Sequence, residues 1–304
     1  LGDVYKRQDH KIDPIPQADY YSMLAFFADI SPQGSGNRNH VAITDLEAND
    51  QLQLVTGADH EEEIGAIVDI YMRQMTNPAV MFDDIPGYPK GYRVLANILT
   101  SVPRINLALD EPVDKSEVEL VDYWRKYMKD QPTHAPLEVN GGPILDNIYE
   151  GKDIDITKIP TPKWHEHDGG YFIGTACMVV MKDPDSGWIN YGAYRVQAHD
   201  SVTASLMTSK GKHGDIIRNK YHDRGEPCPI AVVVGMHPAL FMVAGLEMPY
   251  GKNEYDCAGG LLGEGVEIIN MPKTGLPVPA NAVSYTHLRA HETDSYLVCR
   301  LLLE

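Results

Sequence analysis

Ile-Asn-Tyr-Gly-Ala-Tyr-Arg-Val-Gln-Ala, residues 189–198, is rich in aromatic and apolar residues and follows an Asp-Pro-Asp-Ser-Gly turn at residues 183–187. This composition between turn residues predicts a β-strand. Similar runs at residues 135–139, 172–182 and 229–234 predict further strands. Residues 202–207 and 213–222 are predicted to form helices between them. This half of the chain therefore predicts a mixed β-barrel with inserted helices.

The first half of the chain alternates helical and strand patterns. Apolar spacing predicts helices at residues 20–30 and 61–75, and a short apolar run at residues 79–82 predicts a buried strand. Residues 116–128 place Glu and Lys on one side of a helix and apolar residues on the other, as a helix linking two domains would. The prediction is an α+β protein with an N-terminal α/β domain (residues 9–115), a linker helix (116–132) and a β-barrel domain (133–282).

The two ends of the chain differ from the rest. One DNA sequence that encodes residues 3–8 also encodes residues 283–288 when its complementary strand is read in another frame, and it resembles the end of a transposon used to prepare sequencing libraries. We therefore expect residues 1–8 and 283–304 to be adapter-derived and to carry no information on the fold. On this interpretation His287, His291 and Cys299 indicate no metal or thiol site.

The charge balance limits the kinds of partner. The 304 residues carry a formal net charge of −17 at pH 7. Nucleic acids and anionic membranes attract clusters of Lys and Arg, so we expect neither as a partner. An anionic ligand would need a local site that attracts it.

The cysteines favour a reducing environment. Cys177, Cys228 and Cys257 are widely spaced and odd in number once Cys299 is set aside. This pattern argues against a disulfide framework and against a zinc site, and it favours buried thiols in the cytoplasm. No run reaches the roughly 18 uninterrupted apolar residues of a membrane helix, and no signal peptide is recognisable. We therefore expect a cytoplasmic protein.

A series of short motifs runs through the second half of the chain: His-Asp-Gly-Gly-Tyr at residues 167–171, Asp-Pro-Asp-Ser-Gly at 183–187, Asn-Tyr-Gly-Ala-Tyr-Arg at 190–195, Lys-Gly-Lys-His at 210–213 and Glu-Tyr-Asp-Cys-Ala-Gly-Gly at 254–260. Their order and spacing resemble the flavin-binding domain of the UbiD decarboxylase family. The resemblance covers residues 10–282 and is strongest after residue 137. It implies that residues 133–282 form a split β-barrel that binds prenylated FMN.

The resemblance also implies a divalent-cation site. In the family an Asn, a His and a Glu hold the ion, usually manganese, that binds the flavin phosphate, and these positions correspond to Asn190, His213 and Glu254. Amide, imidazole and carboxylate ligands suit Mn²⁺ or Mg²⁺ better than Zn²⁺. A divalent ion also lets an acidic protein neutralise a dianionic phosphate compactly. Potassium is the second cation implied, held by backbone oxygens near Met248 and by the Glu254 position.

Further contacts follow from the same resemblance. Thr175 corresponds to a residue lying against the cofactor, and Arg195 corresponds to the catalytic arginine, whose guanidinium binds a substrate carboxylate through two parallel hydrogen bonds. Strand alternation would place Asn190 and Arg195 on opposite faces, so we expect a β-bulge or a twist between them, for which Gly192 is a plausible place. The predicted cofactor-binding residues are Thr175, Asn190, Gly192, Ala193, Arg195, Lys212, His213, Met248 and Glu254.

Each of these residues has an ordinary structural explanation when it is considered alone. Asn190 suits a turn, Arg195 suits a solvent-exposed ion pair, and Glu254 suits a helix start. His213 near a helix start is commonly a surface residue. Only the joint pattern favours ligand roles.

The implied activity is reversible, non-oxidative decarboxylation of an aromatic or α,β-unsaturated carboxylic acid by a homo-oligomeric enzyme. In the family, the glutamate that protonates the product and a carboxylate that pairs with the arginine follow the segment that ends here at Ala282, and a C-terminal domain comes after them. We therefore expect these 304 residues to lack the protonating glutamate and the C-terminal domain, and to be inactive.

Two other functions stay open. Split barrels also serve flavin oxidoreductases, which would have no need of a metal held by Asn190, His213 and Glu254. The chain could also belong to a non-catalytic subunit of a carboxylase complex. Catalytic carboxylates in the segment that follows Ala282 in the gene would argue against this alternative.

Overall fold

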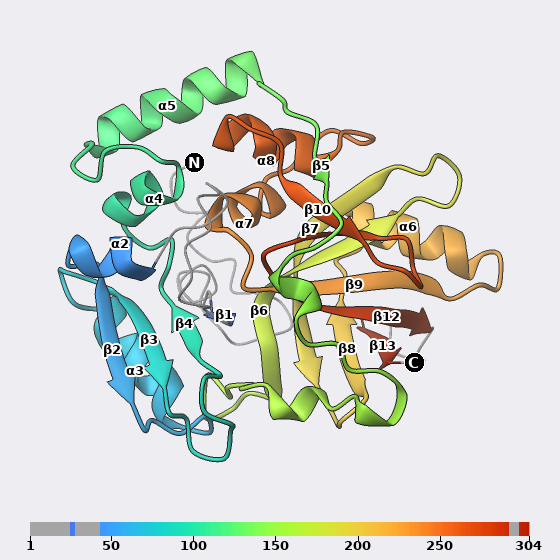
Figure 1. Ribbon diagram of the computed structural model, residues 1–304, viewed down its shortest axis with the longest axis horizontal. Helices are drawn as coiled ribbons and strands as arrows, with labels where there is room; N and C mark the ends of the chain where they lie inside the picture. The colour runs from blue at the N-terminus through green and yellow to red at the C-terminus, as the bar shows by residue number, and fades with distance from the viewer. Residues whose placement is uncertain (1–24, 28–42, 292–297, 304) are drawn as a thin grey trace, which may run out of the picture.

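The computed structural model describes residues 25–27, 43–291 and 298–303, with side chains for residues 45–174 and 177–282. The fold is α+β, as expected. A four-stranded sheet with its helices forms one unit, and a closed six-stranded barrel with its helices forms the other (Figure 1). A small three-stranded sheet, β11-β10-β5, packs beside the barrel.

The N-terminal unit contains β1 (Ala25–Phe27), α2 (Ile43–Ala48), β2 (Leu52–Thr56), α3 (Glu63–Met72), β3 (Ala79–Asp83), β4 (Val94–Ala96) and α4 (Val102–Ala108). Its strand order is β1-β4-β3-β2, with β2 and β3 parallel. The helix α3 makes the crossover that parallel strands require. Two predictions are confirmed here: residues 79–82 are fully buried in β3, and α3 lies within the helix predicted at residues 61–75.

One helix prediction in this unit is wrong where the structure describes it. Within the helix predicted at residues 20–30, residues 25–27 form the edge strand β1, which pairs antiparallel with β4. The rest of that segment lies outside the described residues. A short apolar run such as residues 25–27 suits a helix or a strand equally well. Pairing with the neighbouring strand β4 decides for the strand.

The helix predicted at residues 116–128 is confirmed as α5 (Glu117–Asp130). Ser116 and Glu119 form a capping box at its start, and Gln131 ends it in a left-handed conformation with φ 43°. The hydroxyl group of Tyr127, which lies in α5, donates a hydrogen bond to the Cys257 carbonyl at 2.9 Å. The helix therefore reaches from α4 to α8 of the second unit, as Figure 1 shows.

The second unit contains β5 (Leu137–Glu138), the short 3-10 helices η1 (Pro143–Leu145), η2 (Gly151–Asp153) and η3 (Ile156–Lys158), then β6 (Tyr171–Lys182), β7 (Ile189–Ala198), β8 (Thr203–Met207), α6 (His213–His222), β9 (Cys228–Val234), α7 (Pro238–Ala244), α8 (Glu254–Leu262), β10 (Glu267–Asn270), β11 (Pro277–Pro279), β12 (Val283–His291) and β13 (Val298–Leu303). The barrel order is β12-β13-β8-β7-β6-β9. The strands predicted around β6, β7 and β9 and the helix α6 are confirmed. The helix predicted at residues 202–207 is wrong, because residues 203–207 pair with β7 and β13 as β8.

The segment set apart by its sequence takes part in the barrel. Residues 283–291 pair with β9, and residues 298–303 pair with β8. These residues therefore form part of the barrel, although we set them aside when predicting the fold from the sequence; their adapter origin stays a prediction. Two strands at this place cover the edges of β8 and β9, whose backbone groups would otherwise be unpaired.

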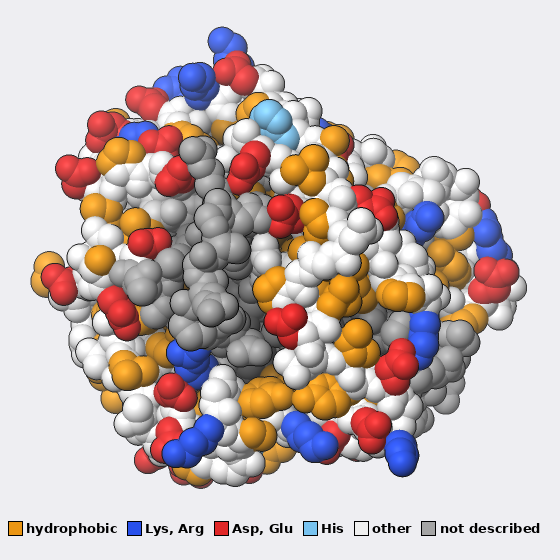
Figure 2. All heavy atoms as spheres, viewed as in Figure 1, with side chains coloured by type: hydrophobic (Ala, Val, Ile, Leu, Met, Phe, Trp, Pro, Cys, Tyr) orange, Lys and Arg blue, Asp and Glu red, His pale blue; other side chains and the backbone are white. Residues whose placement is uncertain are grey.

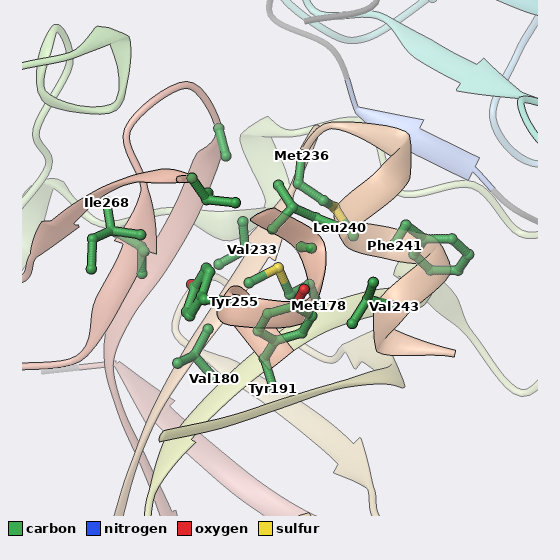
Figure 3. Close-up of a cluster of buried hydrophobic side chains, with 14 of the residues drawn as sticks. Met178, Val180, Tyr191, Val233, Met236, Leu240, Phe241, Val243, Tyr255 and Ile268 are labelled. Atoms are coloured by element: carbon green, nitrogen blue, oxygen red, sulfur yellow. The ribbon is translucent and has the colours of Figure 1, made fainter. Parts of the chain in front are cut away.

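Two hydrophobic cores lie on opposite faces of the barrel strands, because successive side chains of a strand point to opposite faces. Val179 and Val232 lie in one, with Ile217 of α6, and we call it the α6 core. Met178 and Val233 lie in the other, with Tyr255 of α8, and we call it the α8 core. Figure 3 shows the α8 core, where side chains of the barrel strands meet those of α7 and α8. This packing holds the first turn of α8 against the start of β7.

The expectation of buried cysteines is confirmed. Cys177, Cys228 and Cys257 are all buried. Within the described ranges, every helix is too short or too polar to span a bilayer.

Candidate cation and cofactor site

Glu254 begins α8, and its carboxylate is buried beside β7. Asn253 caps the helix by accepting a hydrogen bond from the Tyr255 amide at 3.0 Å. Because Tyr255 is anchored in the α8 core, the residue before it is held against the barrel. Only 2% of Glu254 is exposed, which is unusual for a carboxylate.

Donors from β7 surround this carboxylate. Asn190 donates from Nδ2 to Oε1 at 2.6 Å, and the Tyr191 amide donates to Oε2 at 3.2 Å. The Tyr191 hydroxyl also donates to the Glu254 carbonyl at 3.2 Å. Burial raises the pKa of Glu254 to about 7, although these donors act in the opposite direction. A buried acid of this kind calls for a positive partner when it is ionised.

One oxygen next to this carboxylate lacks a partner. Asn190 Oδ1 is buried and accepts no hydrogen bond among the described residues. Buried polar atoms nearly always have a partner, so such an atom indicates a missing ligand. An amide oxygen beside a carboxylate is a hard donor set that fits Mn²⁺ or Mg²⁺. The described part of the chain holds no group of three or more His, Cys, Asp and Glu side chains with the geometry of a metal site.

His213, the third predicted ligand, begins α6. Its ring packs edge-on against Trp188 and Tyr250, with centroid distances of 5.1 and 5.6 Å. Burial lowers the pKa of His213, and so does the positive charge of Lys212. The structure thus joins Asn190 to Glu254 directly by a hydrogen bond, whereas His213 is placed near β7 by its contact with Trp188.

Tyr194 links α6 to the same part of β7. Its hydroxyl oxygen accepts a hydrogen bond from the Gly214 amide at 3.1 Å. Burial raises the pKa of Tyr194 to about 12, and the charge of Glu254 adds to that rise. The residue after His213 is therefore tied to the strand that carries Asn190.

The predicted irregularity between Asn190 and Arg195 is present, but it does not lie at Gly192. From residue 189 to 194, β7 pairs with β6 residue for residue, and the register shifts lie in β6, between Phe172 and Cys177. The irregularity is therefore opposite Arg195. A bulge on the partner strand changes the twist of the pair and can re-aim side chains without an insertion in β7. The Arg195 guanidinium carbon lies 5.8 Å from the Phe172 ring centroid.

The other predicted cofactor residues lie around this strand. Gly192 and Ala193 are half-buried in β7. Lys212 precedes α6 and forms an exposed ion pair with Glu247, and Met248 packs against the α8 core. Thr175 belongs to β6, but its side chain lies outside the described residues.

Three residues near the site were not predicted from the sequence: Asp183, Trp188 and Tyr250. The turn motif at residues 183–187 was a signal that could have identified Asp183. Nothing around Tyr250 distinguishes it from an ordinary loop tyrosine, because its hydrogen-bond partners lie 30 and 67 residues away in the chain.

The protein as a whole is acidic. Figure 2 shows Asp and Glu side chains spread over the viewed face, with Lys and Arg among them. With a net charge of −17, the protein offers little general attraction for a phosphate. A phosphate-bearing ligand would therefore depend on a local cation.

Family models match both units of the chain. The 3-octaprenyl-4-hydroxybenzoate carboxy-lyase N-terminal domain matches residues 43–124, and the Rift-related domain of the same carboxy-lyase matches residues 137–284. These two matches follow the division between the N-terminal unit and the barrel.

Named proteins resemble the chain in sequence and in fold. It is 33% identical over 240 residues to the pyrrole-2-carboxylic acid decarboxylase of Pseudomonas aeruginosa, covering 76% of this chain and 48% of that protein. The closed form of vanillic acid decarboxylase from Sedimentibacter hydroxybenzoicus shares the fold, with a TM-score of 0.79 and 24% identity over 89% of this chain and 61% of that one. An evolved dimeric UbiD-class enzyme from Pelotomaculum thermopropionicum in complex with prFMN matches with a TM-score of 0.71 and 20% identity. The match covers 86% of this chain and 64% of that one.

The chain spans about half the length of the curated relatives it matches. Both of its units nevertheless match domains of one family, in the family's order, and the fold agrees with the solved structures. The chain belongs to the UbiD family of carboxy-lyases.

Proposed function

We propose that Asn190, His213 and Glu254 hold a divalent cation, Mn²⁺ or Mg²⁺, which binds the phosphate of prenylated FMN. The observation that carries this proposal is the buried, unpartnered Asn190 Oδ1 beside the buried Glu254 carboxylate. A cation would supply the oxygen's missing partner and offset the burial of the carboxylate. Backbone oxygens near Met248, together with Glu254, are the proposed potassium ligands.

The whole protein is proposed to decarboxylate an aromatic or α,β-unsaturated carboxylic acid reversibly, as a homo-oligomer. Relatives named as decarboxylases of pyrrole-2-carboxylic and phenolic acids support this substrate class. Prenylated FMN, when bound, supplies the electron-accepting centre for loss of carbon dioxide. Arg195 binds the substrate carboxylate through its planar guanidinium and orients it.

The proton donor and the C-terminal domain are proposed to lie outside these residues. The barrel is proposed to be the split barrel that binds the flavin, with Thr175, Gly192, Ala193 and Lys212 among its contacts. Without a proton donor the 304-residue chain should bind the cofactor but not complete turnover.

Manganese titration followed by electron paramagnetic resonance tests the site in the chain as it stands. The wild type should bind Mn²⁺, and Asn190→Ala should bind it at least about 10-fold more weakly. Asn270→Ala, at an exposed position of β10, is the matched control and should match the wild type. Wild-type protein that binds no Mn²⁺, or an Asn190→Ala variant that binds it equally well, would overturn the proposed site.

Activity needs the whole protein. The full-length protein with prenylated FMN should release carbon dioxide from members of a panel of acrylic, hydroxybenzoic and pyrrole carboxylic acids, while the 304-residue chain should not. No release from any acid by the manganese-loaded full-length protein would contradict the proposed reaction class.

A further inference from the structure

The turn between β6 and β7 is built around a buried aspartate. Asp183 is fully buried, and its Oδ1 accepts hydrogen bonds from the amides of Asp185 at 2.8 Å and Ser186 at 3.0 Å. The Asp183 amide donates to the Trp188 carbonyl at 2.8 Å, and Gly187 closes the turn with φ 74°. The positive φ explains the glycine in the Asp-Pro-Asp-Ser-Gly motif.

The second carboxylate oxygen of this aspartate reaches two other elements. Oδ2 accepts from Lys220 Nζ at 2.5 Å and from the Tyr250 hydroxyl at 3.1 Å. Lys220 also donates to the Tyr250 oxygen at 3.1 Å. Lys220 belongs to α6, and Tyr250 belongs to the loop that leads to α8. One carboxylate thus connects the β6–β7 turn, α6 and the α7–α8 loop.

The helix α6 carries His213, and the turn and the loop lead into β7 and α8, which carry Asn190 and Glu254. Lys220 follows His213 by seven residues, about two helical turns, so both lie on one face of α6. Trp188 lies two residues before Asn190 in the chain. The Trp188 indole donates to the Lys252 carbonyl at 3.0 Å, two residues before Glu254.

Aromatic rings fill the space between these anchors. Tyr250 packs against Trp188 at 4.7 Å between centroids, and both rings contact His213. The hydroxyl of Tyr250 is held by Asp183, so the carboxylate determines where the ring lies. The ring in turn limits where the His213 imidazole can lie.

We propose that Asp183 is a positioning residue for the divalent cation: through Lys220 and Tyr250 it holds the His213 imidazole at the Asn190–Glu254 pair. This inference rests on the proposed cation site. Groups that orient a metal-binding histidine without touching the metal strongly influence metal affinity. Burial alone would raise the pKa of Asp183, but Lys220 and the turn amides bring that pKa below its ordinary value, so the carboxylate stays charged.

The test measures Mn²⁺ affinity of the 304-residue chain by electron paramagnetic resonance, with melting in EDTA measured in parallel. Asp183→Asn and Tyr250→Leu should each weaken Mn²⁺ binding by about 10- to 100-fold. Tyr250→Phe, which keeps the ring, should have a smaller effect. Lys220→Arg should retain more affinity than Lys220→Met.

Tyr171→Phe is the matched control, since Tyr171 donates its hydroxyl to the Glu61 carboxylate at 2.6 Å in another part of the molecule. It should leave Mn²⁺ affinity unchanged. If Asp183→Asn does not fold, the Mn²⁺ affinity of Tyr250→Leu tests the same inference. Wild-type binding combined with unchanged affinity in the folded Asp183 and Tyr250 variants would overturn this inference alone. Absence of Mn²⁺ binding by the wild type would instead overturn the proposed cation site.

Discussion

The two ends of β7 are built differently. Residues 189–193 pair regularly with β6 and carry Asn190, whose amide meets the Glu254 carboxylate. Residues 194–198 face the part of β6 where the register shifts twice, and they carry Arg195. The regular end holds two of the proposed ligands together in a buried site. The irregular end carries the arginine that we propose binds the substrate, whose remaining contacts are proposed to lie elsewhere.

This difference predicts the largest effect for Arg195 in the full-length protein. Arg195→Ala should lower kcat/KM by an amount that corresponds to a loss of about 2–5 kcal/mol of transition-state stabilisation. The reason is that it removes one partner of a buried charge pair with the substrate. Arg195→Lys should recover only part, since an ammonium lacks the planar fork. Mn²⁺ affinity should not change. Arg73→Ala, which removes an exposed arginine, serves as the control. Equal loss of Mn²⁺ affinity and activity would show that the two ends are not separate.

Glu254 tests the other end of the strand. Glu254→Gln keeps the size of the side chain but removes its charge, so Mn²⁺ affinity should fall by at least about 100-fold, or about 2.8 kcal/mol. Isothermal titration of the 304-residue chain measures this directly. Glu226→Gln, at an exposed position, should bind like the wild type. A Glu254 variant with wild-type affinity would contradict the ligand assignment.

The turn that precedes the regular end should show a pH-dependent stability. Asp183→Asn should lower the free energy of unfolding at pH 7 by about 1.5–3 kcal/mol, since hydrogen bonds to a charged group are lost. The folded-state pKa of Asp183 lies below its ordinary value, so its contribution is present above the unfolded pKa and is lost as pH falls through the folded pKa. The difference between wild type and variant should therefore shrink below about pH 4. Urea unfolding at several pH values measures it. A difference that is constant with pH would contradict the charged state.

The smallest effect is expected at Gly192, where the two ends meet. A Cβ there would lie 2.8 Å from the Tyr194 ring, whose hydroxyl is held by the Gly214 amide. Gly192→Ala should therefore cost about 1 kcal/mol through overpacking. Gly141→Ala places its Cβ in open space and is the control. Thermal unfolding should rank the two variants. Equal melting temperatures would mean that the ring moves freely.

Much of the fold could be predicted from local patterns. Periodicity and turn residues located α3, α5, α6 and the strands β3, β6, β7 and β9, because each has a clear local signal. The five residues of β8 carry no decisive period, so the sequence favours a helix there, whereas pairing with β7 determines the strand. The sequence suggests Gly192 of β7 as a plausible place for the irregularity. Its actual position in β6 depends on the register of two strands, which one strand's sequence does not encode.

The site was less accessible to sequence reasoning. Asn190, His213 and Glu254 were identified only through a family resemblance, because each alone suits a turn or a helix start. The structure adds the buried pair of the Asn190 amide and the Glu254 carboxylate, and the unpartnered amide oxygen. The role proposed for Asp183 depends on contacts with residues 37 and 67 positions away, which no local pattern reveals.

Anomalous diffraction at the manganese absorption edge, from crystals of this chain grown with Mn²⁺, tests the central proposal most directly. The account predicts one strong peak bonded to Asn190 Oδ1, a ring nitrogen of His213 and the Glu254 carboxylate. A manganese peak at any other position, or clear density for these three side chains with no ion between them, would contradict it.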